Sequence, residues 1–194
     1  MSHVAWKPGT MIYPLPAALV SCGATEEEYN MLTVAWVGTI CTNPAMCYIS
    51  VRPERHSYPI IEKNKAFVIN LTTEEMAKAT DLCGVKSGKD CNKWELTGFT
   101  PVASEVVAAP YIKESPLCIE CEVEQIVKLG SHDMFIAKVV QVLADEKDLN
   151  AENGKFELEK AKLLAYSHGH YYGLGEEIGK FGWSVMKPKK KKKK

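Results

Sequence analysis

The sequence predicts a mainly β fold, an antiparallel β-barrel with helical insertions. Runs of apolar, β-branched and aromatic residues, bounded by Gly, Pro, Asn and Asp, occupy both ends of the sequence and enclose a few short helical patterns. No G-x-G-x-x-G motif opens a strand–helix–strand unit, which argues against a Rossmann fold. The 194 residues suit one domain, which we place at 1–186 and which a basic tail follows at 187–194.

The first third of the chain is predicted to contain three strands. An apolar run at 17–21, ended by Gly23, forms the first strand. A second strand covers 32–40, and Cys-Thr-Asn-Pro at 41–44 supplies the turn that follows it. The third strand, at 45–51, is β-branched and aromatic. We therefore expect a hairpin that begins near residue 32 and ends near residue 51.

The middle of the chain carries the helical insertions. Thr72-Thr73-Glu74-Glu75 is a helix-capping signal, and Gly84 and Gly98 are stop signals for the helices before them. The predicted elements are a helix at 57–64, a buried strand at 67–71, a helix at 74–83 and a short helical turn at 90–96.

The last third returns to strands. Alternating runs at 118–129 and 134–144 predict a strand pair around Gly130-Ser131-His132-Asp133. A polar loop follows at 145–154. We predict a further strand at 161–166 and a turn or short strand at 169–172.

The formal net charge of zero hides an uneven distribution. Lys187 and 189–194 hold seven of the 24 basic residues, so the rest of the chain has 17 basic against 24 acidic groups, about −7. An acidic body has no general attraction for nucleic acid. A basic tail is typical of a nucleic-acid or anionic-membrane patch, but like charges in a run repel, and we interpret the tail as solvated and disordered.

The sequence predicts no membrane or export segment. No stretch approaches the ~20 apolar residues of a membrane span, and Pro14 and Pro16 interrupt the apolar patch at 11–22. Without an export signal, we expect a cytoplasmic protein whose seven cysteines are reduced thiols.

Cys118 and Cys121 form a C-x-x-C pair, a pattern known from metal and redox sites. Here the pair lies in an alternating run typical of a strand, where residues three apart face opposite sides. No second pair or histidine partner accompanies it, so we predict packing residues and no metal site.

A cluster of cations and hydroxyls follows the strand at 45–51. Arg52, Arg55, His56, Ser57 and Tyr58 lie within seven positions, at the start of a predicted helix. Arginine gives a forked donor and a helix start gives free N–H groups, a combination that suits a phosphate. The small residues of the preceding hairpin would let a flat ring lie against the backbone. The alternative is a solvated charged loop that leads into a helix.

Six segments resemble the flavin reductase family of FMN-binding split barrels, in its flavoredoxin-like branch. They are Asn30–Trp36, Ile49–Pro53, His56–Tyr58, Phe67–Leu71, Asp81–Asp90 and Tyr166–Gly175, within a resemblance that runs from Pro14 to Trp183. No single segment is a strict motif, but their order and spacing together are specific. The resemblance implies an FMN-binding split barrel of antiparallel Greek-key type.

The resemblance also implies which residues hold FMN. They are Asn30, Thr33, Val34, Ala35, Trp36, Ser50, Val51, Arg52, Arg55, His56, Ser57, Tyr58, Cys83, Gly84, Lys86 and Ser87. It places His168, His170 and Tyr171 beside the flavin, where a substrate would stack. The alternative for these last three is an exposed turn. No residue is assigned as catalytic, and His168 is the candidate proton donor.

The implied activity is that of an FMN-dependent oxidoreductase. NAD(P)H would pass a hydride to the flavin, and the electrons would go on to free flavin, a metal centre, a protein or dioxygen. Two alternatives stay open: a flavoredoxin-like electron carrier reduced by a partner protein, and a non-catalytic flavin-binding protein. The family resemblance further implies a homodimer.

Overall fold

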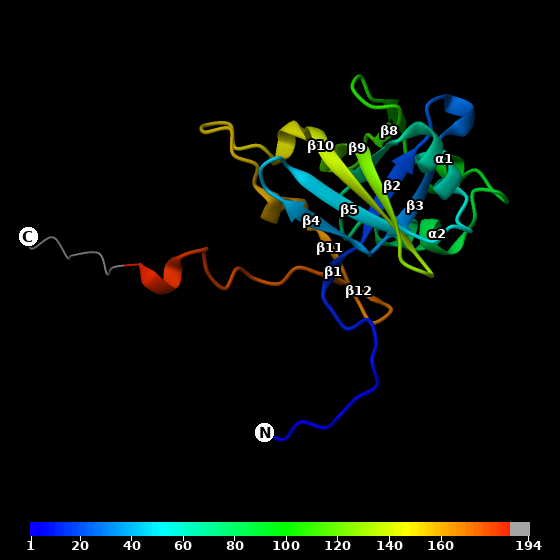
Figure 1. Cartoon of the computed structure of the whole chain (residues 1–194). Helices are drawn as coiled ribbons and strands as arrows, with labels where there is room; N and C mark the ends of the chain where they lie inside the picture. The colour runs from blue at the N-terminus through cyan, green and yellow to red at the C-terminus, as the bar shows by residue number, and fades with distance from the viewer. Residues whose placement is uncertain (187–194) are drawn as a thin grey trace, which may run out of the picture.

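The computed structural model describes residues 1–186, and its main feature is one seven-stranded antiparallel sheet (Figure 1). In spatial order its strands are β3 (Asn30–Val34), β2 (Ala18–Cys22), β6 (Ala66–Asn70), β9 (Leu117–Lys128), β10 (Asp133–Ala144), β5 (Met46–Val51) and β4 (Val37–Cys41). The connection from β5 to β6 skips two strands in space. The predicted mainly β class and split-barrel architecture are confirmed.

The two edges of this sheet are neighbours in sequence, and this closes the barrel. β3 and β4 lie at opposite ends of the strand order, but only Ala35 and Trp36 separate them along the chain. The sheet must therefore curl until its edges meet. The Ser50 N–H donates to the Trp36 carbonyl oxygen at 2.8 Å, which fixes the corner against β5. The single strand predicted for 32–40 is thus wrong: it is two strands joined by this corner.

The barrel interior is the largest part of the hydrophobic core. All five residues of β2 and of β6 are buried, because these strands are covered on both faces. β5 alternates between buried and half-buried positions, as expected for a strand with one face toward the core. Phe67, Phe135 and Ile49 lie fully buried at the centre. The predicted strands at 17–21, 45–51 and 67–71 are confirmed to within one residue at each end.

Three helices cover the end of the barrel where β3 lies. α1 (Ser57–Asn64) has the predicted bounds, and α3 (Lys93–Thr97) falls inside the predicted turn at 90–96 but for its last residue. α2 (Ala77–Val85) starts three residues later than predicted. The capping prediction is wrong because the Thr72 hydroxyl donates to the Ala17 carbonyl oxygen, and the helix has no side-chain cap. α3 is the helix with a cap: Asn92 accepts from the N–H groups of its first turn.

Two small sheets lie outside the barrel. β7 (Pro101–Ala103) pairs with β8 (Pro110–Ile112), a pair that the sequence did not predict because both strands begin with proline. The other small sheet consists of β1 (Leu15–Pro16), β11 (Leu164–Ser167) and β12 (His170–Gly173). The strand predicted at 161–166 corresponds to β11 and begins three residues later than predicted. The predicted pair at 118–129 and 134–144 is confirmed as β9 and β10. The loop at 145–154 holds one 3₁₀ turn, Glu146–Asp148.

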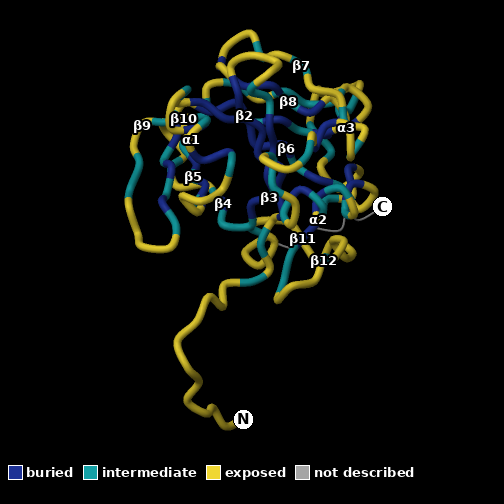
Figure 2. The backbone as a smooth tube through the Cα atoms, turned by 90° about the vertical axis from the view of Figure 1, so that its right-hand side faces the viewer, coloured by how far each residue is buried: buried dark blue, intermediate teal, exposed yellow. Residues whose placement is uncertain are grey.

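Both ends of the described chain leave the barrel as exposed arms. The segments before β1 and after β12 run away from the body (Figure 1), and Figure 2 shows the first of them from another side. They carry large exposed apolar side chains, among them Trp6, Ile12, Ile178 and Phe181. Within residues 1–186, no helix has the length and apolar character needed to cross a membrane. The predicted basic tail at 187–194 lies outside the described residues.

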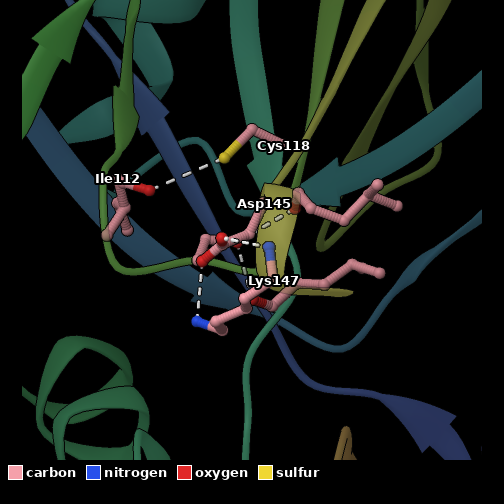
Figure 3. A network of polar contacts seen from close by, with 7 residues as sticks. Ile112, Cys118, Asp145 and Lys147 are labelled. Atoms are coloured by element: carbon pink, nitrogen blue, oxygen red, sulfur yellow. Dashed lines mark hydrogen bonds and ion pairs between the residues drawn. The ribbon is translucent and has the colours of Figure 1, made fainter. Parts of the chain in front are cut away.

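The cysteine pair of β9 faces two different cores. Cys118 lies under β8, where its thiol donates to the Ile112 carbonyl oxygen at 3.6 Å (Figure 3). Cys121 points into the barrel, 3.5 Å from the sulfur of Cys47. This confirms that the pair points to opposite faces of its strand and packs in the core.

Candidate functional site

A cleft of about 360 Å³ opens at the corner between β3 and β4. This size is in the range of small-molecule sites. We call it the ring cleft. Its predicted lining residues are Thr33, Val34, Ala35, Trp36, Ser50, Val51, Arg52, Arg55, Gly84 and Tyr171. Residues from β3, the corner, β5, α2 and β12 thus meet at one place, although they are scattered along the sequence.

The close packing of α2 against β3 shapes one wall of the ring cleft. The Thr33 hydroxyl donates to the Thr80 carbonyl oxygen, which ties the strand to the helix. A Cβ atom added to Gly84 would lie 3.3 Å from the Thr33 Cβ, so only a glycine fits there without displacement. Arg55 Nη1 donates to the Gly84 carbonyl oxygen at 3.1 Å. The last turn of α2 is thereby held next to the cationic segment.

A second, smaller cavity of about 180 Å³ adjoins the ring cleft. We call it the phosphate pocket. Leu32, Arg52 and Arg55 line both cavities, so the two adjoin each other. The predicted residues that line this pocket are Asn30, Arg52, Arg55, His56, Ser57, Lys86 and Ser87. Ser57 is buried at the first position of α1 and accepts a hydrogen bond from Asn30 Nδ2 at 2.7 Å.

The phosphate pocket is strongly cationic. Four basic side chains line it, Arg52, Arg55, Lys86 and Lys93, against the single carboxylate of Glu54. The Glu54 Oε1 lies 2.7 Å from Arg52 Nε, and both side chains are half-exposed. Cations around the start of a helix, together with a buried hydroxyl, form a donor set for a phosphate dianion.

Lys93 is a site residue that the sequence did not reveal. Its ammonium is buried and donates to the Met31 and Cys83 carbonyl oxygens, both at 2.8 Å. Burial lowers its pKa below the ordinary lysine value. A lysine at the start of a short helix is usually exposed, so nothing in its local sequence distinguishes it.

His132 is the second residue that the sequence left out of the site. The prediction placed it in the turn between β9 and β10, but its ring reaches the ring cleft, 6.5 Å from that of Trp36. Burial lowers its pKa, and the positive charge of Arg52 lowers it further. A neutral imidazole therefore faces the cleft near neutral pH, and it can donate or accept a hydrogen bond there.

Two residues predicted to hold the cofactor lie in the core instead. The Tyr58 hydroxyl donates to Asp133 Oδ2 at 2.6 Å, and its ring packs edge-on against Phe135 at 5.2 Å. Cys83 is fully buried between α2 and β2, where burial raises its pKa to about 11. Neither residue lines the ring cleft or the phosphate pocket, so the structure does not bring these two predicted residues to the cavities. Each is a sequence neighbour of a cavity residue, Tyr58 of Ser57 and Cys83 of Gly84, but both side chains turn inward.

Replacing Tyr58 with phenylalanine should destabilise the protein by about 1–3 kcal/mol, because the buried Asp133 loses its partner. The hydrogen bond to Asp133 raises the Tyr58 pKa to about 12. The protonated phenol thus contributes stability that is complete below the unfolded pKa of about 10 and is lost as pH rises toward 12. Urea unfolding from pH 8 to 11 should show a larger alkaline loss in the wild type than in the variant, because Tyr171, whose pKa is also raised, contributes equally to both. A variant that unfolds like the wild type would contradict the role of the hydrogen bond. The variant should keep the wild-type affinity for FMN, because Tyr58 lines neither cavity.

Of the three residues near the β11–β12 turn that were predicted to lie beside a substrate, one reaches the ring cleft. Tyr171 lines the cleft with Tyr166 and Gly169, and its hydroxyl donates to Asp81 Oδ1 at 3.2 Å. Burial and the negative charge of Asp81 raise the Tyr171 pKa to about 12. The two histidines point elsewhere: the His168 ring lies 4.5 Å from that of Tyr13, and His170 is exposed beside Tyr172. Neither histidine lines the cleft, so His168 is not placed as a proton donor.

The comparison with protein families agrees with this geometry. The family model described as a flavin reductase like domain matches residues 10–175. The chain belongs to the flavin reductase-like family. An uncharacterised protein of Pyrococcus abyssi is 32% identical to it over 168 residues, which cover 87% of this chain and 95% of that protein.

Solved structures place this family member in the flavoredoxin-like branch. The flavoredoxin of Desulfovibrio vulgaris (Miyazaki F) superposes with a TM-score of 0.87 at 27% identity, covering 95% of this chain and all of that one. The flavoredoxin of Methanosarcina acetivorans gives 0.86, also at 27% identity, covering 96% of this chain and all of that one. The family and the two adjoining cavities support a flavin-binding redox role.

Proposed function

We propose that this family member is an FMN-binding oxidoreductase that takes a hydride from NAD(P)H. One observation carries the proposal: a cleft lined by small residues and aromatic rings adjoins a cationic pocket at the start of a helix. A ring and a phosphate joined by a short chain match these two cavities in chemistry. When bound, FMN would supply the hydride-accepting ring that connects the nicotinamide to a further acceptor.

The residues of the two cavities divide the binding between them. Ala35 and Gly84 leave the backbone accessible for a flat ring, and Trp36 and His132 border the ring cleft. Arg52, Arg55 and Lys86 would bind the phosphate through charge-assisted hydrogen bonds. The cations near the cleft also favour the negative charge that a flavin gains when it is reduced.

A nicotinamide would enter from the side of the β11–β12 turn. Tyr166 and Tyr171 present aromatic rings there, 5.7 Å apart, and such rings suit stacking. Stacking and alignment account for much of the rate of a hydride transfer. The acceptors consistent with this open cleft are free flavin, a metal centre, a protein or dioxygen.

The test is anaerobic reduction. Protein loaded with FMN should be yellow and should lose its absorption near 450 nm when NADH or NADPH is added, with saturation at rising nucleotide concentration. Replacing Tyr171 with alanine should raise the nucleotide concentration needed for half-reduction, while FMN stays bound. Bound FMN that neither nucleotide reduces at saturation would refute the enzymatic proposal. Protein that does not take up FMN would refute the flavin assignment itself.

A second candidate function is electron transfer without NAD(P)H. The observation that favours it is the similarity to two flavoredoxins over nearly the whole chain. In that case FMN would be reduced by a partner protein, and the nucleotide test would fail while a reduced ferredoxin or rubredoxin succeeds. A flavin-binding protein without catalysis would respond to neither reductant.

We also propose a homodimer, because both exposed arms carry large apolar side chains that water would otherwise contact. Trp6 and Ile12 lie on the first arm, Phe181 and Trp183 on the second. A second copy of the chain would cover them. Analytical ultracentrifugation at micromolar concentration should give about twice the 21.6 kDa mass. A monomeric mass would contradict this proposal.

A further inference from the structure

We propose that the end of the ring cleft next to the β11–β12 turn is a subsite for a flat aromatic cation, and that Asp81 gives it this selectivity. We call this end, formed by Asp81, Tyr166 and Tyr171, the cation subsite. The ligand class is a pyridinium ring, the form that a nicotinamide takes once it has given up a hydride. The inference rests on the proposed function, because it concerns the same nucleotide, and it adds the charge state of the ring that the protein favours.

The charged side chains that line the ring cleft are separated by sign. Arg52 and Arg55 stand where the cleft adjoins the phosphate pocket, whereas Asp81 comes from the middle of α2. Among the described residues that line the cleft, Asp81 is the only acidic one. Within residues 1–186 its carboxylate belongs to no ion pair. Its negative charge therefore acts on a ligand at this end of the cleft without a paired cation to cancel it.

A hydrogen bond joins Asp81 to the aromatic side of the cleft. The Tyr171 hydroxyl donates to Asp81 Oδ1 at 3.2 Å, and the Tyr171 ring lies 5.7 Å from that of Tyr166, tilted by 59°. Burial raises the pKa of Tyr171, and the negative charge of Asp81 raises it further, so the carboxylate acts on this phenol directly. A carboxylate beside the electron-rich faces of two aromatic rings attracts a cation more than a neutral ring of the same shape.

A hydride transfer creates a positive charge at this end of the cleft. The C–H bond of the reduced nicotinamide breaks and the hydrogen leaves with both bonding electrons, so a neutral ring becomes a pyridinium with one positive charge. The ring that accepts the hydride gains the matching negative charge, which the two arginines at the other end of the cleft favour. Because the separated charges are bound better than the neutral reactants, the arrangement lowers the barrier. The cation subsite should therefore hold the oxidised nucleotide more tightly than the reduced one.

The experiment compares NAD⁺ and NADP⁺ with their tetrahydro derivatives, whose neutral ring cannot give up a hydride. Dissociation constants for the FMN-loaded protein come from the change in the flavin absorption spectrum. The wild type should bind the oxidised nucleotide at least ~3-fold more tightly than its tetrahydro derivative, the size of a cation–π contact at an exposed site. Asp81→Asn keeps an oxygen for the Tyr171 hydrogen bond but loses the charge, and should bring the ratio close to one. Asp81→Glu retains the charge and should retain the preference.

Glu62→Gln is the matched control, because Glu62 is an exposed acid on α1 that lines neither cavity. It should keep the wild-type ratio. The ratio is the readout, since a displaced Tyr171 ring would weaken both forms of the nucleotide alike. Equal wild-type affinities, an unchanged ratio in Asp81→Asn, or the same loss in Glu62→Gln would overturn the inference, while reduction of bound FMN by NADH or NADPH would leave the proposed function intact. FMN-loaded protein that binds no nucleotide in either form would end both.

Discussion

Replacing Arg52 with alanine should weaken FMN binding by about 10- to 100-fold, the effect of losing one charge-assisted hydrogen bond worth ~1.5–3 kcal/mol. Arg52 lines both cavities, and within residues 1–186 its one ion pair is with the half-exposed Glu54, which leaves the rest of its guanidinium for a phosphate. Riboflavin has the same ring and side chain without the phosphate. Its dissociation constant should change by less than about threefold. Fluorescence titration of both flavins measures the two effects.

Lys138→Ala is the matched control for this loss of positive charge. Lys138 is a half-exposed cation on β10 whose ion pair with Glu124 lies outside both cavities. Its removal should leave both titrations unchanged. The loss in Arg52→Ala should also shrink at high salt, because salt screens exposed charges. If FMN and riboflavin weakened equally, Arg52 would belong to the ring, and an unchanged FMN affinity would remove it from the phosphate pocket.

The parts of the fold that the sequence predicted are those set by local patterns. β9 and β10 have long alternating sequences on either side of a Gly-Ser-His-Asp turn. α1 ends at Lys65, whose backbone takes the left-handed conformation. The phosphate cluster was predictable for the same reason: its cations and hydroxyl follow one another between a strand and a helix. Residues adjacent in sequence at such a junction cannot lie far apart in space.

The parts that the sequence did not predict depend on tertiary contacts. The corner at Ala35 and Trp36 exists because β3 and β4 lie on opposite edges of a curled sheet, and no local signal marks it. Thr72 looked like a helix cap but bonds across the fold to Ala17. His132 reaches the ring cleft because the β9–β10 hairpin extends past the neighbouring strands.

Lys93 shows how a buried cation can serve both stability and binding. Lys93→Met keeps most of the side-chain volume and removes two charge-assisted hydrogen bonds, to the carbonyl oxygens of Met31 and Cys83. Part of this loss is offset because the buried ammonium no longer has to be desolvated. We expect the free energy of unfolding to fall by about 2–4 kcal/mol, and the melting temperature of the flavin-free protein by roughly 5–15 °C.

Lys89→Met separates this effect from the general loss of a lysine, since Lys89 lies four residues earlier and is exposed. It should change the free energy of unfolding by less than about 0.5 kcal/mol. Urea unfolding followed by tryptophan fluorescence compares both variants with the wild type. If Lys93→Met were as stable as the wild type, the cost of burying the ammonium would equal the gain from its hydrogen bonds. In that case Lys93 would matter for the phosphate pocket that it lines and not for stability. The Lys93→Met variant would then bind FMN more weakly while its free energy of unfolding stays unchanged.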